Sequence, residues 1–333
     1  MSPALPGTRG LFSALQHALS RGDSRRVRLN QQVYDTAADF QQLVLSLGSR
    51  PTRLHELVPT APVIVGASDA CRHGMGGVWL DGASAHPTPL LWRYPFPAFI
   101  SQALVTSDNP RGSLSISDLE LAAIVAHGNI IAQTRDVRER TLWVASDNRA
   151  AVSWSTKGSS TSLAARAYLL RLKASHQRHH RYLARHHYIP GPVNAMADDA
   201  SRLWALSDSE LISHFNSHYP QAHSWHVHPL TSAMSASVIG ALCKQRLPIE
   251  LPTSATPPLP PVGTSGLPSV AASNSIPSPW ALATPSRSCS SSPSATAPEP
   301  LRPAATLSAL AQWRTPYERW ARRTPGWGPL TLA

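Results

Sequence analysis

The feature that most constrains the fold is a pair of short runs that are apolar at every position. They are residues 63–65 ("VIV") and 142–144 ("LWV"). A strand with one face in water alternates apolar and polar residues, whereas a strand covered on both faces reads as a continuous apolar run. The two runs are therefore expected to be the central, parallel strands of a sheet that carries helices on both faces.

The other elements follow from changes of period along the chain. "APVIVGASDA" and "GMGGVWLDG" predict two antiparallel strands joined by a Gly-rich hairpin, and "PLLWRY" predicts a third strand. The helix "SISDLELAAIVAHG" is expected to stop at Gly128. A fourth strand ("TLWVASD"), helices over 149–155 and 163–178, a fifth strand ("RYLARHHYIPG") and a final helix ("NAMADDASRLWAL") follow. This order predicts an α/β fold, a mixed five-stranded sheet flanked by helices.

The N-terminal part, residues 1–58, has a helical pattern. "YDTAADFQQLVLSLG" repeats apolar residues at helical spacing and is expected to end on Gly48 as a C-cap. Before it, Leu11, Phe12, Leu15 and Leu19 form a short amphipathic stripe in a segment that lacks acids before Asp23. The stripe fits an ordinary helix and also fits a transit peptide, and the sequence leaves both interpretations open.

The C-terminal part is expected to lack a fold. The chain of 333 residues holds 31 prolines, and most of the excess follows Leu247. Order is expected to fade after about Ser213, with a disordered Pro/Ser/Ala-rich linker over 213–305 and a short basic, Trp-containing helix over 306–333. Residues 59–212 then form the folded domain, and removing everything after about Pro220 is expected to leave it intact.

Charge and cysteine content restrict the partners. Lys and Arg outnumber Asp and Glu by 30 to 19, a formal net charge of +11, which favours a polyanionic partner. No apolar run approaches the ~20 residues of a membrane span, so a soluble protein is expected. Cys71, Cys243 and Cys289 lack the spacing of a disulfide framework or a zinc site. An intracellular location, cytoplasm or nucleus, is expected.

Two aspartates follow the two apolar runs. If those strands are parallel neighbours, Asp69 and Asp147 emerge side by side at the carboxyl ends, where open α/β sheets place ligand sites. Each Asp alone can also simply start a turn or cap a helix. Adjacent carboxylates without a basic neighbour repel each other, and a bound cation relieves that cost.

Two further acidic residues have a structural alternative. Glu120 stands three residues after Ser117, so it fits a capping box at the start of its helix. Asp198, in "ADDASR", fits an acid in a first helical turn, where it complements the helix dipole.

Four segments, in chain order, resemble a known nuclease family. "ASDACRHGMGGVWL", "SDLELAAIV", "ASDNRAAV" and "YIPGPVNAMADDASRL" resemble the ribonuclease H domain fused to reverse transcriptases of gypsy-like and DIRS-like retrotransposons. The resemblance covers about residues 59–212, and residues 1–58 resemble the connection between polymerase and nuclease in such elements. No Tyr-x-Asp-Asp motif precedes this connection, so no polymerase activity is expected.

The resemblance implies a ribonuclease H-like fold and a metal-dependent endonuclease that cuts the RNA strand of RNA:DNA hybrids. The family's catalytic, metal-binding acids fall on Asp69, Glu120, Asp147 and Asp198. It implies two Mg²⁺ ions, or Mn²⁺, roughly 4 Å apart, with Asp69 and Asp147 central. Glu120 would bind one ion and Asp198 the other, and RNA would be selected through its 2′-hydroxyls. The helical wheel alone does not separate Asp198 from Asp199; the family register selects Asp198 and leaves Asp199 to the helix dipole. A nucleic-acid partner and no membrane are implied.

One position departs from the family. Many members carry a His in the loop before the last Asp, where this chain has Tyr188. His187 is adjacent, but in a strand it points to the opposite face. The departure is compatible with reduced turnover or with an inactive relic.

The segment "RAYLLRLKASHQRHHRYLARHH" is rich in His and basic residues. His176, His179 and His180 share a helix face, which suggests a metal site, but no carboxylate or Cys joins them. Phosphate contact is favoured over a merely solvated basic face. The predicted nucleic-acid-binding residues are Arg171, Lys173, Arg178, Arg181 and Asn148.

Three functions compete at this point. The leading one is the ribonuclease H activity, in a fragment of a retrotransposon polyprotein. The second is a catalytically inactive module that binds nucleic acid from a decayed element. The third is an interaction protein that binds partners through the Pro-rich tail.

Overall fold

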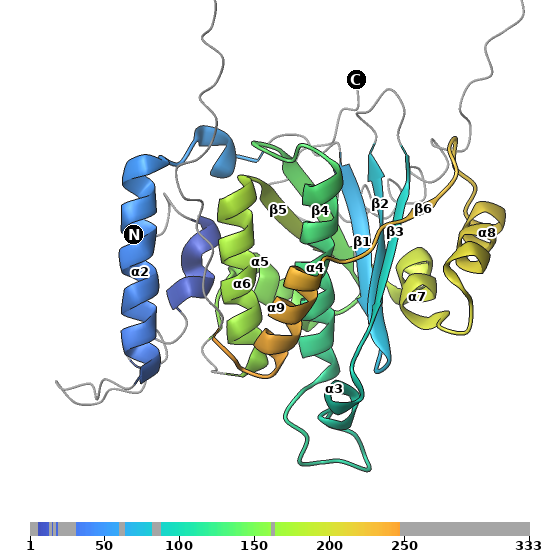
Figure 1. Ribbon diagram of the computed structural model, residues 1–333, viewed down its shortest axis with the longest axis horizontal. Helices are drawn as coiled ribbons and strands as arrows, with labels where there is room; N and C mark the ends of the chain where they lie inside the picture. The colour runs from blue at the N-terminus through green and yellow to red at the C-terminus, as the bar shows by residue number, and fades with distance from the viewer. Residues whose placement is uncertain are drawn as a thin grey trace, which may run out of the picture. The chain divides into compact units, whose positions relative to one another are not determined.

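A mixed sheet lies at the centre of the fold (Figure 1). The computed structural model describes residues 6–12, 15, 18, 31–59, 64–81, 88–160 and 164–246, and within these the sheet has six strands in the order β5-β4-β1-β2-β3-β6. The strands are β1 (Ile64–Ala70), β2 (Gly74–Asp81), β3 (Leu90–Pro95), β4 (Thr141–Ser146), β5 (Leu183–Tyr188) and β6 (His226–Val227).

The strand directions match the sequence prediction. β1, β2 and β3 form an antiparallel meander, whereas β4 and β5 continue the sheet in parallel beyond β1. β1 is buried along its whole length, and its Ile64 pairs with Leu142 of β4, so the two apolar runs are indeed neighbours. The mixed α/β, ribonuclease H-like fold is thus confirmed. The two-residue β6, parallel to β3, adds a sixth strand to the predicted five.

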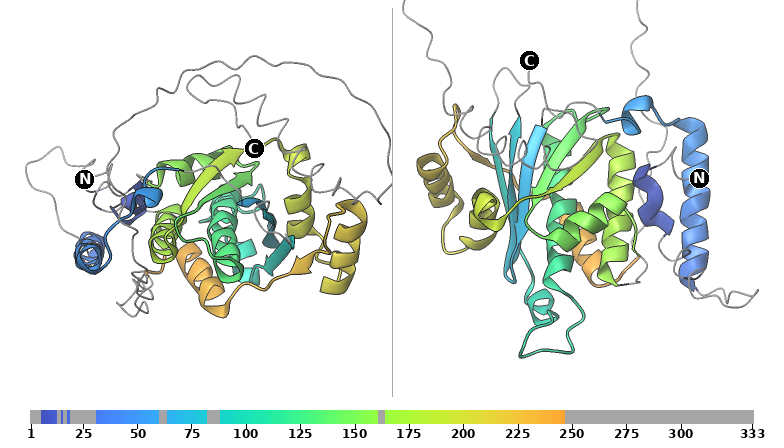
Figure 2. Two further views of the ribbon diagram at one scale, coloured as in Figure 1. Left: turned by 90° about the horizontal axis from the view of Figure 1, so that it is seen from above. Right: turned by 180° about the vertical axis from the view of Figure 1, so that it is seen from behind.

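Helices cover both faces of the sheet (Figures 1 and 2). One face carries α4 (Ile116–Thr134), α5 (Arg149–Lys157), α6 (Ala165–His180) and α9 (Ser232–Leu242), whose apolar side chains form the larger core. The other face carries α7 (Ala195–Arg202) and α8 (Asp208–His218), which bury Met196, Leu211 and Phe215 in a second core. This burial explains why the central strands need apolar residues on both sides.

The sequence predicted that the helix ends at Gly128, and this prediction is wrong. α4 continues to Thr134, and Gly128 lies inside it. A Cβ at this position would stand 2.5 Å from the hydroxyl oxygen of Tyr182, so the glycine permits close packing. Glycine is found at helix ends and also where two segments approach closely. The sequence alone does not distinguish these two uses, so the prediction of a helix end at Gly128 failed.

The N-terminal region packs on the outer side of α6. η1 (Pro6–Phe12) places Leu11 in a small core with Leu43 of α2 (Gln31–Ser49) and Ala174 of α6. α2 includes Gly48, which the sequence predicted as a C-cap. The short helix η2 (Leu54–Glu56) follows. The predicted stripe ends at Leu19, outside the described residues.

The boundary predicted near Ser213 is wrong. α8 runs to His218, β6 extends the sheet, and α9 buries Met234, Val238 and Leu242 in the larger core. These elements therefore belong to the folded domain. The rest of the predicted linker, the helix predicted within 306–333, and Cys289 lie outside the described residues.

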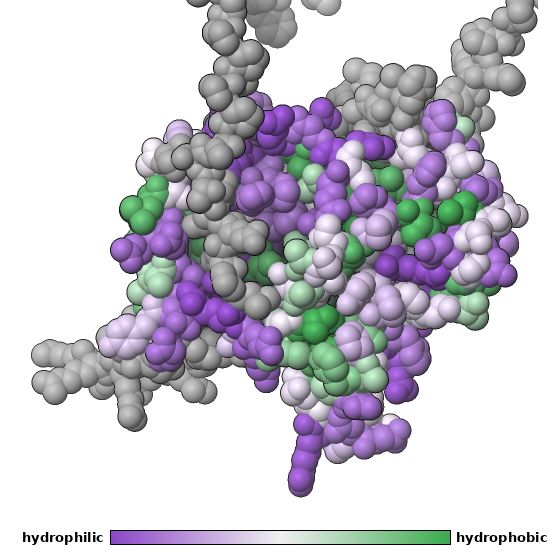
Figure 3. Space-filling model, in the orientation of Figure 1, coloured by the Kyte–Doolittle hydropathy of each residue, from purple (hydrophilic) through white to green (hydrophobic). Residues whose placement is uncertain are grey.

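The remaining described elements are α3 (Ala98–Gln102) and the one-turn helix η3 (Gly191–Val193). None of the helices in the described ranges is long and apolar enough to cross a membrane. On the face drawn in Figure 3, hydrophilic side chains predominate and hydrophobic ones show in separate patches.

Candidate metal centre

Asp69 stands at the carboxyl end of β1. It is the last residue but one of the strand and is only 2% exposed. The hydroxyl of Ser201, on α7, donates a hydrogen bond of 2.5 Å to Asp69 Oδ2. Gly76 of β2 pairs with Asp69 and has no side chain, which leaves room for the backbone of Ala200. α7 can therefore lie close enough to the sheet for Ser201 to reach Asp69. The strand and the helix together hold the carboxylate in place.

Asp147 follows the last residue of the neighbouring strand, β4. β1 and β4 are parallel and in register from Ile64 with Leu142 to Ala67 with Ala145, so their carboxyl ends lie side by side. Asp147 is half-buried. The following residue, Asn148, starts α5: its Oδ1 accepts a hydrogen bond of 3.0 Å from the Ala151 backbone N–H.

Glu120 enters the same site from α4. Ser115 is the N-cap of α4, and Ser115 and Asp118 form the capping box, so the predicted alternative of a Ser117–Glu120 box is wrong. Glu120 is 5% exposed and accepts a hydrogen bond from the Ala70 backbone N–H. Its Oε2 atom has no hydrogen-bond partner among the described residues.

The three carboxylates form one cluster. Each of Asp69, Glu120 and Asp147 offers an oxygen, and these atoms lie within 4.8 Å of one another. Burial raises the pKa of Asp69 to about 6, with a further contribution from the charge of Asp147. Burial, and then the charges of the two aspartates, holds the pKa of Glu120 well above its usual value. Burial also raises the pKa of Asp147. Such repulsion is relieved by a bound cation.

The cluster lies in an open cleft of about 650 Å³. Besides the carboxylates, the lining includes basic side chains that the sequence analysis did not single out, Arg72, His73 and Arg202. Ser201 was also missed. Ser201 is 0% exposed and lies on the buried face of α7. A polar residue on a buried face needs a hydrogen-bond partner, and this is the signal that could have identified it.

Asp198 and Asp199 have different surroundings. Asp198 is 40% exposed, and its Oδ1 accepts a hydrogen bond of 2.5 Å from Nε of Arg202. It lies outside the group of three, although its charge contributes to the raised pKa of both Asp69 and Asp147. Asp199 instead accepts hydrogen bonds from Tyr219 Oη at 2.9 Å and from His214 of α8. Asp199 therefore joins α7 to α8, a role that the predicted dipole contact did not include.

The helical wheel of the final predicted helix places Met196, Ala200, Leu203 and Trp204 in one buried stripe, and the end of α7 differs from this prediction. Its buried residues are Met196, Ala197, Ala200 and Ser201, and the helix ends at Arg202, before Leu203 and Trp204. Trp204 donates to the Ser201 carbonyl instead of extending the stripe.

Tyr188 lies at the end of β5 and is 38% exposed. The guanidinium of Arg149 lies 4.3 Å from the centre of its ring. The neighbouring His187 packs its ring edge-on against Trp143, and burial lowers the pKa of His187 to about 3. His187 thus stays neutral and is used in packing.

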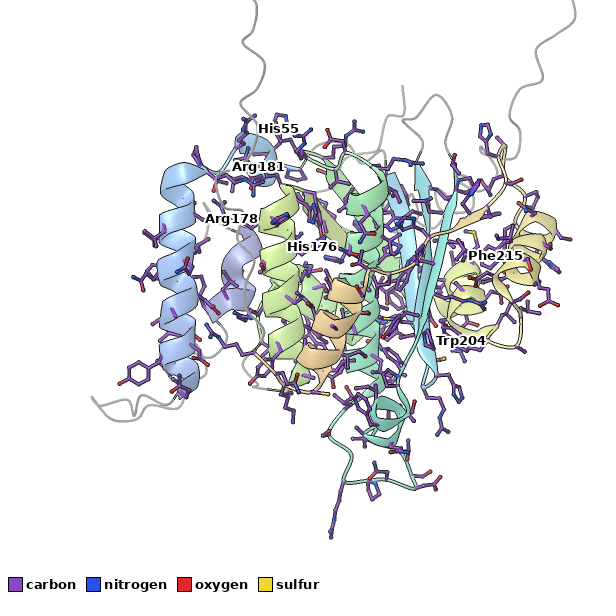
Figure 4. All side chains as sticks on the ribbon, in the orientation of Figure 1. His55, His176, Arg178, Arg181, Trp204 and Phe215 are labelled. Carbon is purple, nitrogen blue, oxygen red and sulfur yellow. The ribbon has the colours of Figure 1, made fainter. Side chains whose placement is uncertain are left out.

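The basic residues of α6 are engaged inside the protein. Figure 4 shows Arg178 and Arg181 at the end of α6, near His55 of η2. Arg171 pairs with buried Asp39 of α2 at 2.6 Å, and Lys173 donates to the Ser155 carbonyl at 2.8 Å. Arg178 donates to the Arg50 carbonyl and Arg181 pairs with Glu56 at 3.8 Å. Arg171, Arg178 and Arg181 therefore contact the N-terminal segment, whereas Lys173 contacts α5.

The histidines of α6 do not form a metal site. Among the described residues, one group of three or more His, Cys, Asp or Glu side chains has ligand atoms close enough to share a metal ion, and it consists of Asp69, Glu120 and Asp147. His176 instead hydrogen-bonds Tyr182 Oη at 3.0 Å and approaches the Asn129 amide at 3.3 Å. The ring of His180 packs against that of His176.

Comparisons with known proteins give little further information. No protein-family model matches the chain, and no curated protein matches it. Among solved structures, the chain is similar to the crystal structure of native prototype foamy virus protease–reverse transcriptase, with 10% sequence identity and a TM-score of 0.24. The match covers 56% of this chain and 22% of that chain. The likeness is weak, so the fold assignment rests on the strand order and the helices described above.

Proposed function

We propose that the chain is a metal-dependent endonuclease of the ribonuclease H type, derived from a retrotransposon, that cuts the RNA strand of RNA:DNA hybrids. The observation that carries the proposal is the convergence of Asp69, Glu120 and Asp147, from β1, α4 and the end of β4, within 4.8 Å. Three separate elements deliver these acids to one cleft, at the sheet edge where such folds place their ligands.

The acids suit a hard divalent cation. Carboxylate oxygens are the ligands that Mg²⁺ and Mn²⁺ prefer, and Glu120 Oε2 is buried without a partner among the described residues. Asp69, Glu120 and Asp147 would hold one ion, and Asp69, Asp147 and Asp198 a second. When bound, such ions lower the pKa of a coordinated water and stabilise charge on the leaving oxygen.

The protein's own side chains have distinct tasks in this proposal. Ser201 orients Asp69 through its hydrogen bond, and Glu120 is fixed by the Ala70 N–H. Arg72, on the cleft wall, supplies positive charge toward the phosphates of a duplex. The hybrid as substrate is supported by the four segments that resemble ribonuclease H and by the net charge of +11.

The test is cleavage of a labelled RNA:DNA hybrid, with DNA duplex and RNA duplex as comparison substrates, in Mg²⁺, Mn²⁺ or EDTA. We expect metal-dependent cleavage of the RNA strand alone, which Asp69→Asn and Asp147→Asn abolish while hybrid binding persists. Undiminished cleavage in either variant would overturn the assignment.

A second candidate is a module that binds hybrids without cutting them. It is favoured by Tyr188 at the loop position and by Asp198, which is paired with Arg202. In that case the wild type binds the hybrid, and no tested metal ion produces cleavage.

A further inference from the structure

Arg202 stands at the candidate metal centre. It is the last residue of α7 and lines the same cleft as Asp69, Glu120 and Asp147. Its Nε atom lies 2.5 Å from Asp198 Oδ1, one helical turn earlier. A cation is therefore already present where the fourth acid meets the cluster.

The charge of Arg202 acts on the whole cluster. It lowers the pKa of Asp69, of Glu120 and of Asp147, opposing the effect of burial in each case. A guanidinium keeps its charge at all physiological pH values, so this counter-charge is permanent. Arg202 is 57% exposed, which leaves its side chain room to move toward solvent.

The two expected metal positions differ in their relation to Arg202. An ion bound by Asp69, Glu120 and Asp147 uses carboxylates that make no ion pair with Arg202, whereas an ion that also uses Asp198 shares that carboxylate with Arg202, which holds its Oδ1 atom. The second ion would also meet the positive charge of the guanidinium at close range.

We propose that Arg202 is a built-in competitor of the second divalent cation: it occupies Asp198 when metal is scarce and must release it for the two-ion site to form. This inference rests on the proposed function, because it needs the acids to bind metal. Metal binding is then stepwise, with one tight ion and one weak ion. The weak ion sets the metal concentration at which the site becomes complete.

The test measures Mn²⁺ binding to the full chain by isothermal titration calorimetry and by electron paramagnetic resonance. Neither measurement needs cleavage activity. The variants are Arg202→Met, which keeps the side-chain length and removes the charge, and Arg202→Lys, which keeps the charge. Arg138→Met is the matched control, since Arg138 also makes an ion pair with a nearby aspartate, Asp136, at 2.9 Å, but on a more exposed surface. Circular dichroism and thermal melting confirm that each variant is folded.

We expect the wild type to bind one Mn²⁺ ion tightly and a second ion at least tenfold more weakly. Arg202→Met should tighten the second ion about tenfold, as removal of a competing charge predicts, with little change in the first. Arg202→Lys should lie nearer the wild type, Arg138→Met should match it, and adding Asp198→Asn to Arg202→Met should remove the second ion.

Two results would overturn the inference. One is a second-ion affinity that is unchanged or weaker in Arg202→Met, with the first ion still bound; this outcome leaves the proposed nuclease intact. The other is a wild type that binds no Mn²⁺ at all, which removes the proposed function as well.

Discussion

Two of the three acids in the cluster are buried, which destabilises the metal-free protein. Asp69 and Glu120 are 2% and 5% exposed, and both have a raised pKa because burial and neighbouring charges disfavour their ionised forms. Folded proteins tolerate such arrangements mainly at functional sites, where stability is exchanged for chemistry. The cost should be measurable.

Replacement of Glu120 by Gln should stabilise the metal-free protein. The amide removes one buried charge from the cluster and can still accept the Ala70 N–H bond. We expect the free energy of unfolding in EDTA to rise on the order of 1 kcal/mol, and the stabilisation by Mg²⁺ to be lost. Urea unfolding with and without Mg²⁺ measures both. Asp108→Asn, in an exposed loop, serves as control; a clear loss of stability in Glu120→Gln would contradict the prediction.

Protons should compete with metal at Asp69. Its pKa of about 6 means that the carboxylate is free for a cation above pH 6 and increasingly protonated below it, so metal affinity should be lost as the pH falls through 6. Ser201→Ala removes the hydrogen bond that favours the ionised form. We expect the loss of affinity to begin at higher pH, by up to about 1 unit.

Mg²⁺ titrations between pH 5 and 8 test this shift. Ser155→Ala is the matched control, because Ser155 is also buried, at 3% exposure, but lies on α5, away from the cleft lining. Superimposed pH profiles for both variants and the wild type would refute the role of Ser201.

At the scale of elements, prediction from sequence succeeded where one pattern dominates. The two apolar runs identified β1 and β4, and their parallel pairing identified the edge of the sheet where Asp69 and Asp147 meet. Prediction from sequence failed where contacts between distant elements determine the role of a residue. Gly128 sits inside α4 because of Tyr182, and the α6 arginines serve the packing of the N-terminal helices. No local pattern carries such information.

The missed helix, α9, illustrates a second limit. "SAMSASVIGAL" has apolar and small residues around its whole circumference, so it lacks the amphipathic stripe that marks a surface helix. It packs on α4 and α6, with Val238 at 0% exposure. Its proximity to the Pro-rich segment further obscured it.

Val238→Ala tests whether α9 belongs to the folding unit. Removing two buried methyl groups should lower the free energy of unfolding by roughly 2 kcal/mol, whereas Val105→Ala, at a site 51% exposed, should change it little. Chemical denaturation of the two variants gives the comparison. If Val238→Ala were as stable as Val105→Ala, the prediction that the chain beyond about Pro220 is dispensable would hold again.

At the scale of the whole molecule, the core encloses neutral histidines. His127 stacks on Trp79 with ring centres 3.9 Å apart and accepts a hydrogen bond from Trp92 Nε1. Burial holds the pKa of His127, His176 and His186 well below the usual value. In the unfolded chain these rings bind protons below about pH 6.5. Acidification therefore favours unfolding, whereas the raised pKa values of the acidic cluster act in the opposite direction.

The last prediction concerns this dependence on pH. Each histidine that is neutral in the fold and free to protonate when unfolded should cost roughly 1.4 kcal/mol between pH 7.5 and 5.5, and three cost roughly 4. Saturating Mg²⁺ keeps the acids ionised, so the histidine effect should appear without their opposing contribution. His186 allows a sharp test, because neither ring nitrogen has a hydrogen-bond partner among the described residues. We expect His186→Leu to preserve stability at pH 7.5 and to reduce the loss at pH 5.5 by roughly 1.4 kcal/mol, whereas the exposed His226→Gln changes neither. Urea unfolding at the two pH values decides: an undiminished loss in His186→Leu would mean that His186 is not neutral in the folded protein.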